Sequence, residues 1–300
     1  MIGCGTKDTK EQDAYRQYGI TCMESGKYED AVKAFQNALG ESIGHIGEKE
    51  LDICFYKAKA QALDGKTKDA LATYNAIIKY NKDARAYYLR GDLYMDMGEE
   101  KKGKADFESA VQHGKKNYEI YIGIYESLSR HEKKDEGQKY LSAAMEIKGD
   151  KPEDELYKGR ISYLLGENKD AISYLEKAKE HKQMLASYYL GLAYDANGDS
   201  DKAKKCIAEY IKSGVATSYD LYELGMQEMQ DGNYKNALTY FNSGLELEKV
   251  PNKQNLMKSA IAAYEYSGDF DSAKKMMKEY LKAYPDDEEA KHENTFLETR

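Results

Sequence analysis

The chain has 300 residues, of which 33% are charged and 41% are hydrophobic, and its formal net charge at pH 7 is −8. Lysine and arginine are scattered among acidic residues, so no basic stripe is present that could neutralise a phosphate backbone, and we expect no nucleic-acid partner. No apolar run approaches the ~20 residues that a membrane-spanning helix requires. The low count of 3 prolines is typical of a helical protein.

The first eleven residues, MIGCGTKDTKE, lack the apolar spacing that the rest of the chain shows. They place a glycine directly before Cys4 and continue as a polar run. This arrangement resembles the end of a bacterial lipoprotein signal, whose cysteine becomes the lipidated first residue of the mature protein. The resemblance implies that residues 1–11 are a tether, that Cys4 carries a lipid anchor, and that the protein lies in the bacterial cell envelope, outside the cytoplasmic membrane. The alternative is a cytoplasmic protein with a free thiol at Cys4.

From residue 12 onward a helix-turn-helix outline recurs, for example in ESGKYEDAVKAF at 24–35 and in YSGDFDSAKKMM at 266–277. In each unit a small residue opens the second helix, a turn residue stands five positions earlier, and a bulky apolar residue follows four positions later. The small residues are Ala31, Ala70, Gly103, Gly137, Ala171, Ala203, Ala237 and Ala273. The bulky residues are Phe35, Tyr74, Phe107, Leu141, Leu175, Ile207, Phe241 and Met277.

The turn residue is a glycine in seven of the eight units and Glu132 in the fourth. Glycine adopts the left-handed conformation that ends a helix without a Cβ clash, so we expect each of these glycines at a helix C-terminus. The fourth unit also has Tyr125 where most other units have a small residue in the first helix. These two departures leave the register of the fourth unit open.

This pattern resembles the tetratricopeptide repeat, a 34-residue helix pair. The resemblance covers about eight units over residues 12–285, and the polar residues 286–300 are expected to form a capping helix. It implies an all-α fold, a right-handed α-α superhelix of about eight helix pairs, because one helix pair cannot bury its apolar face alone. It also implies a concave groove that binds a peptide or another protein, and therefore a non-enzymatic scaffold or adaptor.

The sequence has no phosphate-binding P-loop and no dinucleotide fingerprint. None of the five histidines has a His, Cys or Asp partner at metal-ligand spacing. Cys22, Cys54 and Cys206 fall within repeat helices, where each is expected to be a small buried hydrophobe. We therefore expect no enzymatic activity, no bound metal and no cofactor.

In the tetratricopeptide family the first helix of each unit lines the groove, and the resemblance carries one inward position through all eight units. That position falls on Arg16, Phe55, Tyr88, Ile122, Leu156, Tyr188, Tyr222 and Lys258. Neighbouring inward positions are Met95, Tyr163, Leu192, Met226 and Met229. Tyrosine and methionine suit a surface that adapts to peptides. A register error of one residue would place the same column in the core, so both interpretations stay open.

Acidic residues Asp92, Glu119 and Glu126 near the same face suggest a ligand with some positive charge. Two function classes follow. The favoured one is a lipid-anchored scaffold of the bacterial cell envelope that holds a peptide or protein in its groove. The alternative is a cytosolic tetratricopeptide protein with a regulatory or co-chaperone-like role.

Overall fold

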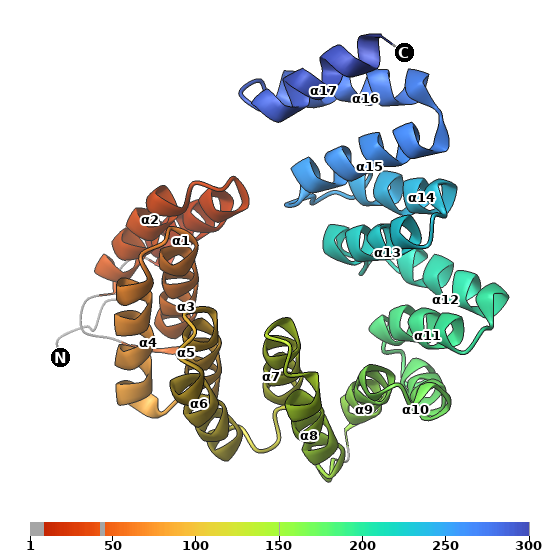
Figure 1. Ribbon diagram of the computed structural model, residues 1–300. Coiled ribbons are helices and arrows are strands. Elements are labelled where there is room, and N and C mark those ends of the chain that lie inside the picture. The colour runs from red at the N-terminus through yellow and green to blue at the C-terminus, as the bar shows by residue number, and fades with distance from the viewer. Residues whose placement is uncertain (1–8, 43–45, 150, 300) are drawn as a thin grey trace. The chain divides into compact units, whose positions relative to one another are not determined.

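The structure is a computed structural model that describes residues 9–42, 46–149 and 151–299 (Figure 1). Cys4 therefore lies outside the described residues. Within the described ranges the chain forms seventeen helices and no strand, which confirms the predicted all-α repeat fold. The chain divides into two compact units, residues 1–207 (unit 1) and residues 208–300 (unit 2).

Unit 1 consists of successive helix pairs joined by short turns (Figure 1). From α1 to α10 the two helices of each pair pack against each other, and up to α11 the second helix of one pair contacts the first helix of the next. Buried residues of α11 and α12 share one core cluster. The helices are α1 (Thr9–Glu24), α2 (Tyr28–Gly40), α3 (Glu48–Leu63), α4 (Thr67–Asn81), α5 (Ala84–Asp96), α6 (Glu100–His113), α7 (Tyr118–Arg130), α8 (Lys134–Met145), α9 (Pro152–Leu165), α10 (Asn168–Glu180), α11 (Leu185–Ala196) and α12 (Ser200–Lys212), whose last residues belong to unit 2.

Unit 2 continues the same pairing and ends in a single additional helix. This last helix contacts α16 and begins after Asp287, whose side chain caps it by accepting a hydrogen bond from the Ala290 N–H. The helices are α13 (Ser218–Gln230), α14 (Tyr234–Leu245), α15 (Lys253–Ser267), α16 (Phe270–Ala283) and α17 (Glu288–Glu298).

The predicted turn residues occupy the left-handed region in every unit. All seven turn glycines have a positive φ, between 70° at Gly26 and 86° at Gly198. Glu132 adopts the same conformation with φ 60°. A side chain on Gly137 would lie 3.1 Å from the Tyr125 Cα, so these two residues meet at the helix crossing. Both observations fix the register of the fourth unit as the sequence alignment placed it.

Small and bulky residues interlock in the core. Ala171 and Ala237 are fully buried, as are Phe35 and Phe241. A Cβ added to Gly19 of α1 would come within 2.6 Å of the Phe35 ring, so the glycine makes room for the bulky residue of its own unit. The same ring also stacks on Tyr56 of the following unit at 5.7 Å. Bulky residues therefore join the two helices of a pair and also contact the next pair.

Helix boundaries differ slightly from those expected from the sequence. Helix α1 begins at Thr9, inside the segment predicted as a tether, because the amphipathic spacing of a helix does not show where its polar first turn starts. At the other end, α17 lies within the segment 286–300 that was predicted to cap the array.

Candidate functional site

The predicted groove column follows the first helices of the pairs, and the structure separates its members by burial. Phe55, Ile122 and Leu156 are at most 8% exposed and belong to core clusters. These three side chains cannot offer contact area to a ligand, so the core interpretation of this column applies to them. The physical reason is that the first helix of each unit is covered both by its own partner and by the neighbouring pairs.

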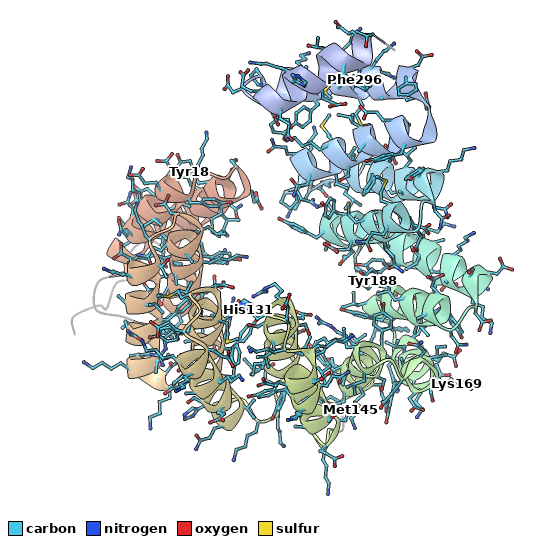
Figure 2. The ribbon with its side chains drawn as sticks, in the orientation of Figure 1. Tyr18, His131, Met145, Lys169, Tyr188 and Phe296 are labelled. Carbon is cyan, nitrogen blue, oxygen red and sulfur yellow. The ribbon has the colours of Figure 1, made fainter. Side chains whose placement is uncertain are left out.

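Among the other predicted groove residues, Met95 is buried at 5% exposure. Partial exposure remains for Tyr88, Tyr163 and Tyr188 in unit 1 and for Tyr222 and Met226 in unit 2. Figure 2 shows Tyr188 on one side of the helix pairs of unit 1 and Lys169 on the other. The ring of Tyr188 meets that of Tyr189 edge to face at 5.1 Å. Partial exposure leaves these residues available for contact.

The side chain of Tyr88 on α5 packs between helices, although part of it remains exposed. A Cβ on Gly123 of α7 would lie 2.6 Å from the Tyr88 Cζ, and the ring centroid is 6.3 Å from that of Phe107. Burial raises the pKa of Tyr88 well above its ordinary value, and the carboxylates of Asp92 and Glu126 add to the rise. The residue therefore acts mainly as a packing element between two units.

The two basic residues of the column are held by acidic partners. Arg16 of α1 lies 2.6 Å from Asp52 of α3, with its guanidinium over the Tyr56 ring. Lys258 of α15 pairs with Asp287 at 2.9 Å. Neither side chain can bind a carboxylate of a ligand without first breaking its existing ion pair.

Ion pairs between first helices of successive units were not foreseen from the sequence. Arg130 of α7 lies 2.6 Å from Asp92 of α5, and Arg160 of α9 contacts both Glu119 and Glu126 of α7 at 3.3 and 3.0 Å. These acids are therefore partly neutralised within the protein. The expectation that they select a positively charged ligand in unit 1 is not supported. The sequence does carry a signal for these pairs, because oppositely charged residues occur about one repeat apart on successive first helices.

An apolar stripe lies along α13 in unit 2. Tyr219 is 56% exposed, and Tyr222, Met226 and Met229 are partly exposed. Their spacing of three or four residues places them on one face of the helix. The predicted residues Tyr222, Met226 and Met229 belong to this stripe, whereas Tyr219 was missed because it precedes the column by one turn.

A cavity of about 390 Å³ lies between α15, α16 and α17. Met226 of the stripe accepts a hydrogen bond from the Ser259 hydroxyl of α15, with 3.6 Å between Oγ and Sδ. A second cavity of about 550 Å³ lies between α2, α3 and α4, and Leu51, Cys54 and Ile77 are in its wall. No predicted groove residue lines this second cavity.

The cysteines and histidines of the described chain form no reactive constellation. Cys22 and Cys206 are buried, and burial raises the pKa of the partly buried Cys54 thiol, which disfavours a nucleophilic thiolate. Among the residues that the structure describes, no group of three or more His, Cys, Asp or Glu side chains is arranged to hold a metal ion. None of the described helices combines the length and the apolar character needed to cross a membrane.

Models of the tetratricopeptide repeat match residues 19–78, 84–112, 185–213 and 254–287, more than half of the chain in total. The comparison with curated protein sequences gave no match. Three solved structures illustrate the similarity. A tetratricopeptide repeat protein from Parabacteroides merdae is 12% identical, with 85% of this chain and 99% of that chain covered and a TM-score of 0.49.

PilW, a type IV pilus biogenesis factor, is 18% identical, with 70% of this chain and 97% of that chain covered and a TM-score of 0.46. The C-terminal part of a TPR repeat-containing protein from Cytophaga hutchinsonii is 14% identical, with 81% and 98% covered and a TM-score of 0.40. The matched repeats, with the helix pairs and left-handed turns described above, show that the chain belongs to the tetratricopeptide repeat family.

Proposed function

We propose that this protein is a non-enzymatic scaffold that binds an unfolded or helical peptide segment of a partner protein along the stripe of α13. Tetratricopeptide repeats mediate protein–protein interactions, which supports the general assignment. The observation that carries the location is the apolar stripe formed by Tyr219, Tyr222, Met226 and Met229. Tyr219 is exposed, and the other three side chains pack against the core of unit 2 while remaining partly exposed. Large apolar side chains that are accessible together on one face are typical of an interaction surface.

The chemistry of the stripe favours a peptide ligand. Tyrosine contributes a large contact area with few rotamers to freeze, and methionine adapts its shape to different side chains. The stripe differs in this respect from the first-helix face of unit 1, where Arg130 and Arg160 engage the neighbouring carboxylates. We therefore assign the binding energy to unit 2.

Selection from a displayed library of random twelve-residue peptides tests this proposal. The affinity of the selected peptides is measured by fluorescence anisotropy on the wild type, on Tyr222→Ala/Met226→Ala and on Tyr80→Ala/Met97→Ala. The last variant is the matched control, because Tyr80 and Met97 are 54% and 44% exposed and lie outside the stripe.

We expect the stripe variant to lose about ten-fold or more in affinity, which corresponds to about 1.4 kcal/mol, and the control variant to bind as the wild type does. Failure to select any peptide contradicts the proposed function. Equal affinities of the stripe variant and the wild type also contradict it.

We also propose that the scaffold is attached to the bacterial cell envelope by a lipid on Cys4, a residue outside the described part of the structure. The support is the Gly-Cys-Gly sequence followed by a polar run. The complete gene, expressed with and without Cys4→Ser in a bacterium fed an alkyne-tagged fatty acid, provides the test. Tagged protein in the membrane fraction, lost with Cys4→Ser, is the expected result, and an untagged wild type contradicts the proposal.

A further inference from the structure

The cavity between α15, α16 and α17 has an apolar floor. Ile261, Met277 and Ala290 are each at most 5% exposed and line it. Its volume of about 390 Å³ falls within the range of small-ligand sites. The floor thus suits an aliphatic chain, and the identity of the ligand depends on the polar groups around it.

Those polar groups are mainly acidic. Glu265 of α15 and Glu289 and Glu293 of α17 line the cavity from two sides. The lysine in the wall, Lys258, already pairs with Asp287 at 2.9 Å and with Glu289 at 3.3 Å. The surplus of carboxylates makes the cavity complementary to a cation and repels an anion.

An aromatic ring forms a further part of the wall. Tyr266 is 68% exposed, and its ring stacks on that of Tyr234 with 5.3 Å between the centroids and 20° between the planes. Stacking holds the exposed ring in one orientation. A cation placed over an aromatic face is attracted by the ring quadrupole.

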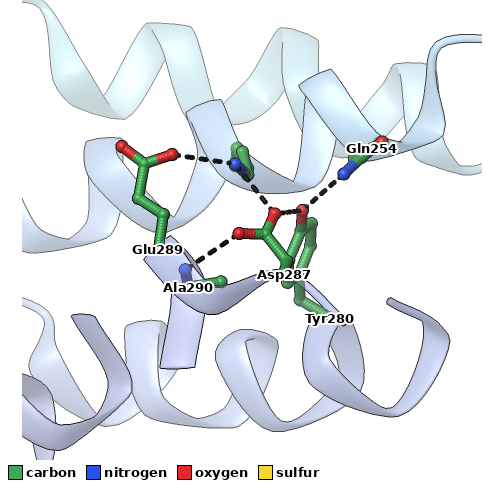
Figure 3. A network of polar contacts seen from close by, with 6 residues as sticks. Gln254, Tyr280, Asp287, Glu289 and Ala290 are labelled. Atoms are coloured by element: carbon green, nitrogen blue, oxygen red, sulfur yellow. Dashed lines mark hydrogen bonds and ion pairs between the residues drawn. The ribbon is translucent and has the colours of Figure 1, made fainter. Parts of the chain in front are cut away.

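A polar network fixes the walls of the cavity relative to one another (Figure 3). The Tyr280 hydroxyl of α16 donates to Asp287 at 2.5 Å and accepts from the Gln254 amide of α15 at 2.8 Å. Asp287 also accepts from the Ala290 N–H of α17 at 3.0 Å. Three helices are therefore held by one carboxylate and one phenol, so a ligand meets a largely preformed site.

From this arrangement we infer that the cavity binds a lysine or arginine side chain of the peptide ligand. The aliphatic stem of that side chain lies on the floor, and its charged end lies among Glu265, Glu289 and Glu293. Ser259, which contacts Met226 of the stripe, is adjacent in sequence to Lys258 in the cavity wall. Helix α15 therefore borders both the stripe and the cavity, so one peptide can contact the two. The inference rests on the proposed peptide-binding function.

The peptides selected on the wild-type protein test this inference. We expect the selected peptides to carry apolar residues that contact the stripe. We also expect lysine or arginine to be enriched at one position, a fixed number of residues away from those apolar residues. The strongest peptide is then synthesised with norleucine at that position, which keeps an aliphatic chain and removes the charge. Affinities are measured on the wild type, on Glu265→Gln/Glu293→Gln and on the control Glu246→Gln/Glu279→Gln. The control makes the same change of net charge at exposed positions on and next to the second helices.

We expect about a ten-fold loss of affinity for the norleucine peptide on the wild type and for the basic peptide on Glu265→Gln/Glu293→Gln. The control variant should retain full affinity. With the cavity variant, the norleucine peptide should lose no further affinity, because both changes remove the same interaction. Raising NaCl from about 50 to about 500 mM should weaken only the basic peptide appreciably.

Two results overturn the inference and differ from failure of the proposed function. Selected peptides that need Tyr222 and Met226 but carry no enriched basic residue show that the stripe binds and the cavity does not. Equal losses on the cavity variant and the control variant show that only overall charge matters. If no peptide depends on the stripe, the proposed function fails, and the inference fails with it.

Discussion

The ring of Tyr88 on α5 occupies the space that a side chain at Gly123 on α7 would need, with 2.6 Å between the Tyr88 Cζ and an added Cβ. The contact joins the first helices of two successive units. This contact explains why Tyr88, which the sequence places at a predicted groove position, contributes more to the packing between helices than to the accessible surface.

Gly123→Ala should therefore destabilise unit 1. The added methyl group has to displace the Tyr88 ring, and overpacking of this kind costs about 1–3 kcal/mol. Urea unfolding followed by circular dichroism gives the change. The control is Gly40→Ala at the end of α2, where an added Cβ meets nothing within 4 Å. This control should be neutral or stabilising by up to about 1 kcal/mol, and a stability loss as large as that of Gly123→Ala would contradict the packing role of Tyr88.

Glu132→Gly should stabilise the protein. Glu132 has a φ of 60° at the position where the other units have glycine, and a left-handed residue with a Cβ costs about 1–2 kcal/mol. The reciprocal change, Gly98→Ala, introduces that cost at a φ of 74° where no atom lies within 4 Å of an added Cβ. Thermal midpoints should move in opposite directions for the two variants, and a lower midpoint for Glu132→Gly would disprove the strain.

The bidentate pair of Arg90 and Asp106 provides a third prediction. The Arg90 Nε donates to Oδ2 at 2.7 Å and Nη2 donates to Oδ1 at 2.6 Å, and the side chains are only 18% and 9% exposed. Asp106→Ala leaves the guanidinium without its carboxylate and should lower the free energy of unfolding by about 3 kcal/mol. The double variant Arg90→Met/Asp106→Leu should recover most of this loss, because no buried charge remains.

Denaturant titrations of the two Arg90–Asp106 variants and of Lys102→Ala provide the measurement. Lys102 pairs with Glu99 at an exposed position, so its removal should change stability little. A double variant that is as unstable as Asp106→Ala would show that the unpaired charge of Arg90 does not cause the loss of stability.

The environment of Asp287 predicts that the stability of unit 2 depends on pH. Hydrogen bonds from Tyr280 and Lys258 and from the Ala290 N–H hold the pKa of this carboxyl well below its usual range. A carboxyl whose pKa is lower in the folded chain stabilises the fold above its unfolded pKa of about 3.9. That contribution is lost as the pH falls toward the folded pKa. The difference in urea midpoint between the wild type and Asp287→Asn should therefore be constant near neutral pH and shrink below about pH 4.

Tyr280→Phe is the companion variant, because it removes the hydroxyl that contributes most to the low pKa of Asp287. It should reduce the pH dependence without abolishing it, since Lys258 still lies 2.9 Å from the carboxylate. A midpoint difference for Asp287→Asn that grows as the solution becomes more acidic would contradict the assignment.

Much of the fold follows from the sequence alone. A small residue such as Ala171 and a bulky residue such as Leu175 are one helical turn apart and face the same neighbour, so their recurrence determines which helix faces are buried. The turn glycines are equally local, because a positive φ is a property of one residue. Even Glu132 takes the left-handed conformation that its position in the alignment predicts.

The surface of the candidate site was decided only by the tertiary structure. Phe55 and Tyr222 hold equivalent positions in their units, yet Phe55 is 6% exposed under the guanidinium of Arg85 at 4.4 Å, whereas Tyr222 remains partly exposed. Exposure depends on side chains contributed by a neighbouring unit about one repeat away, as does the pairing of Arg130 with Asp92. A repeating pattern specifies which residues are equivalent, but the space around each of them is set by neighbours that vary from unit to unit.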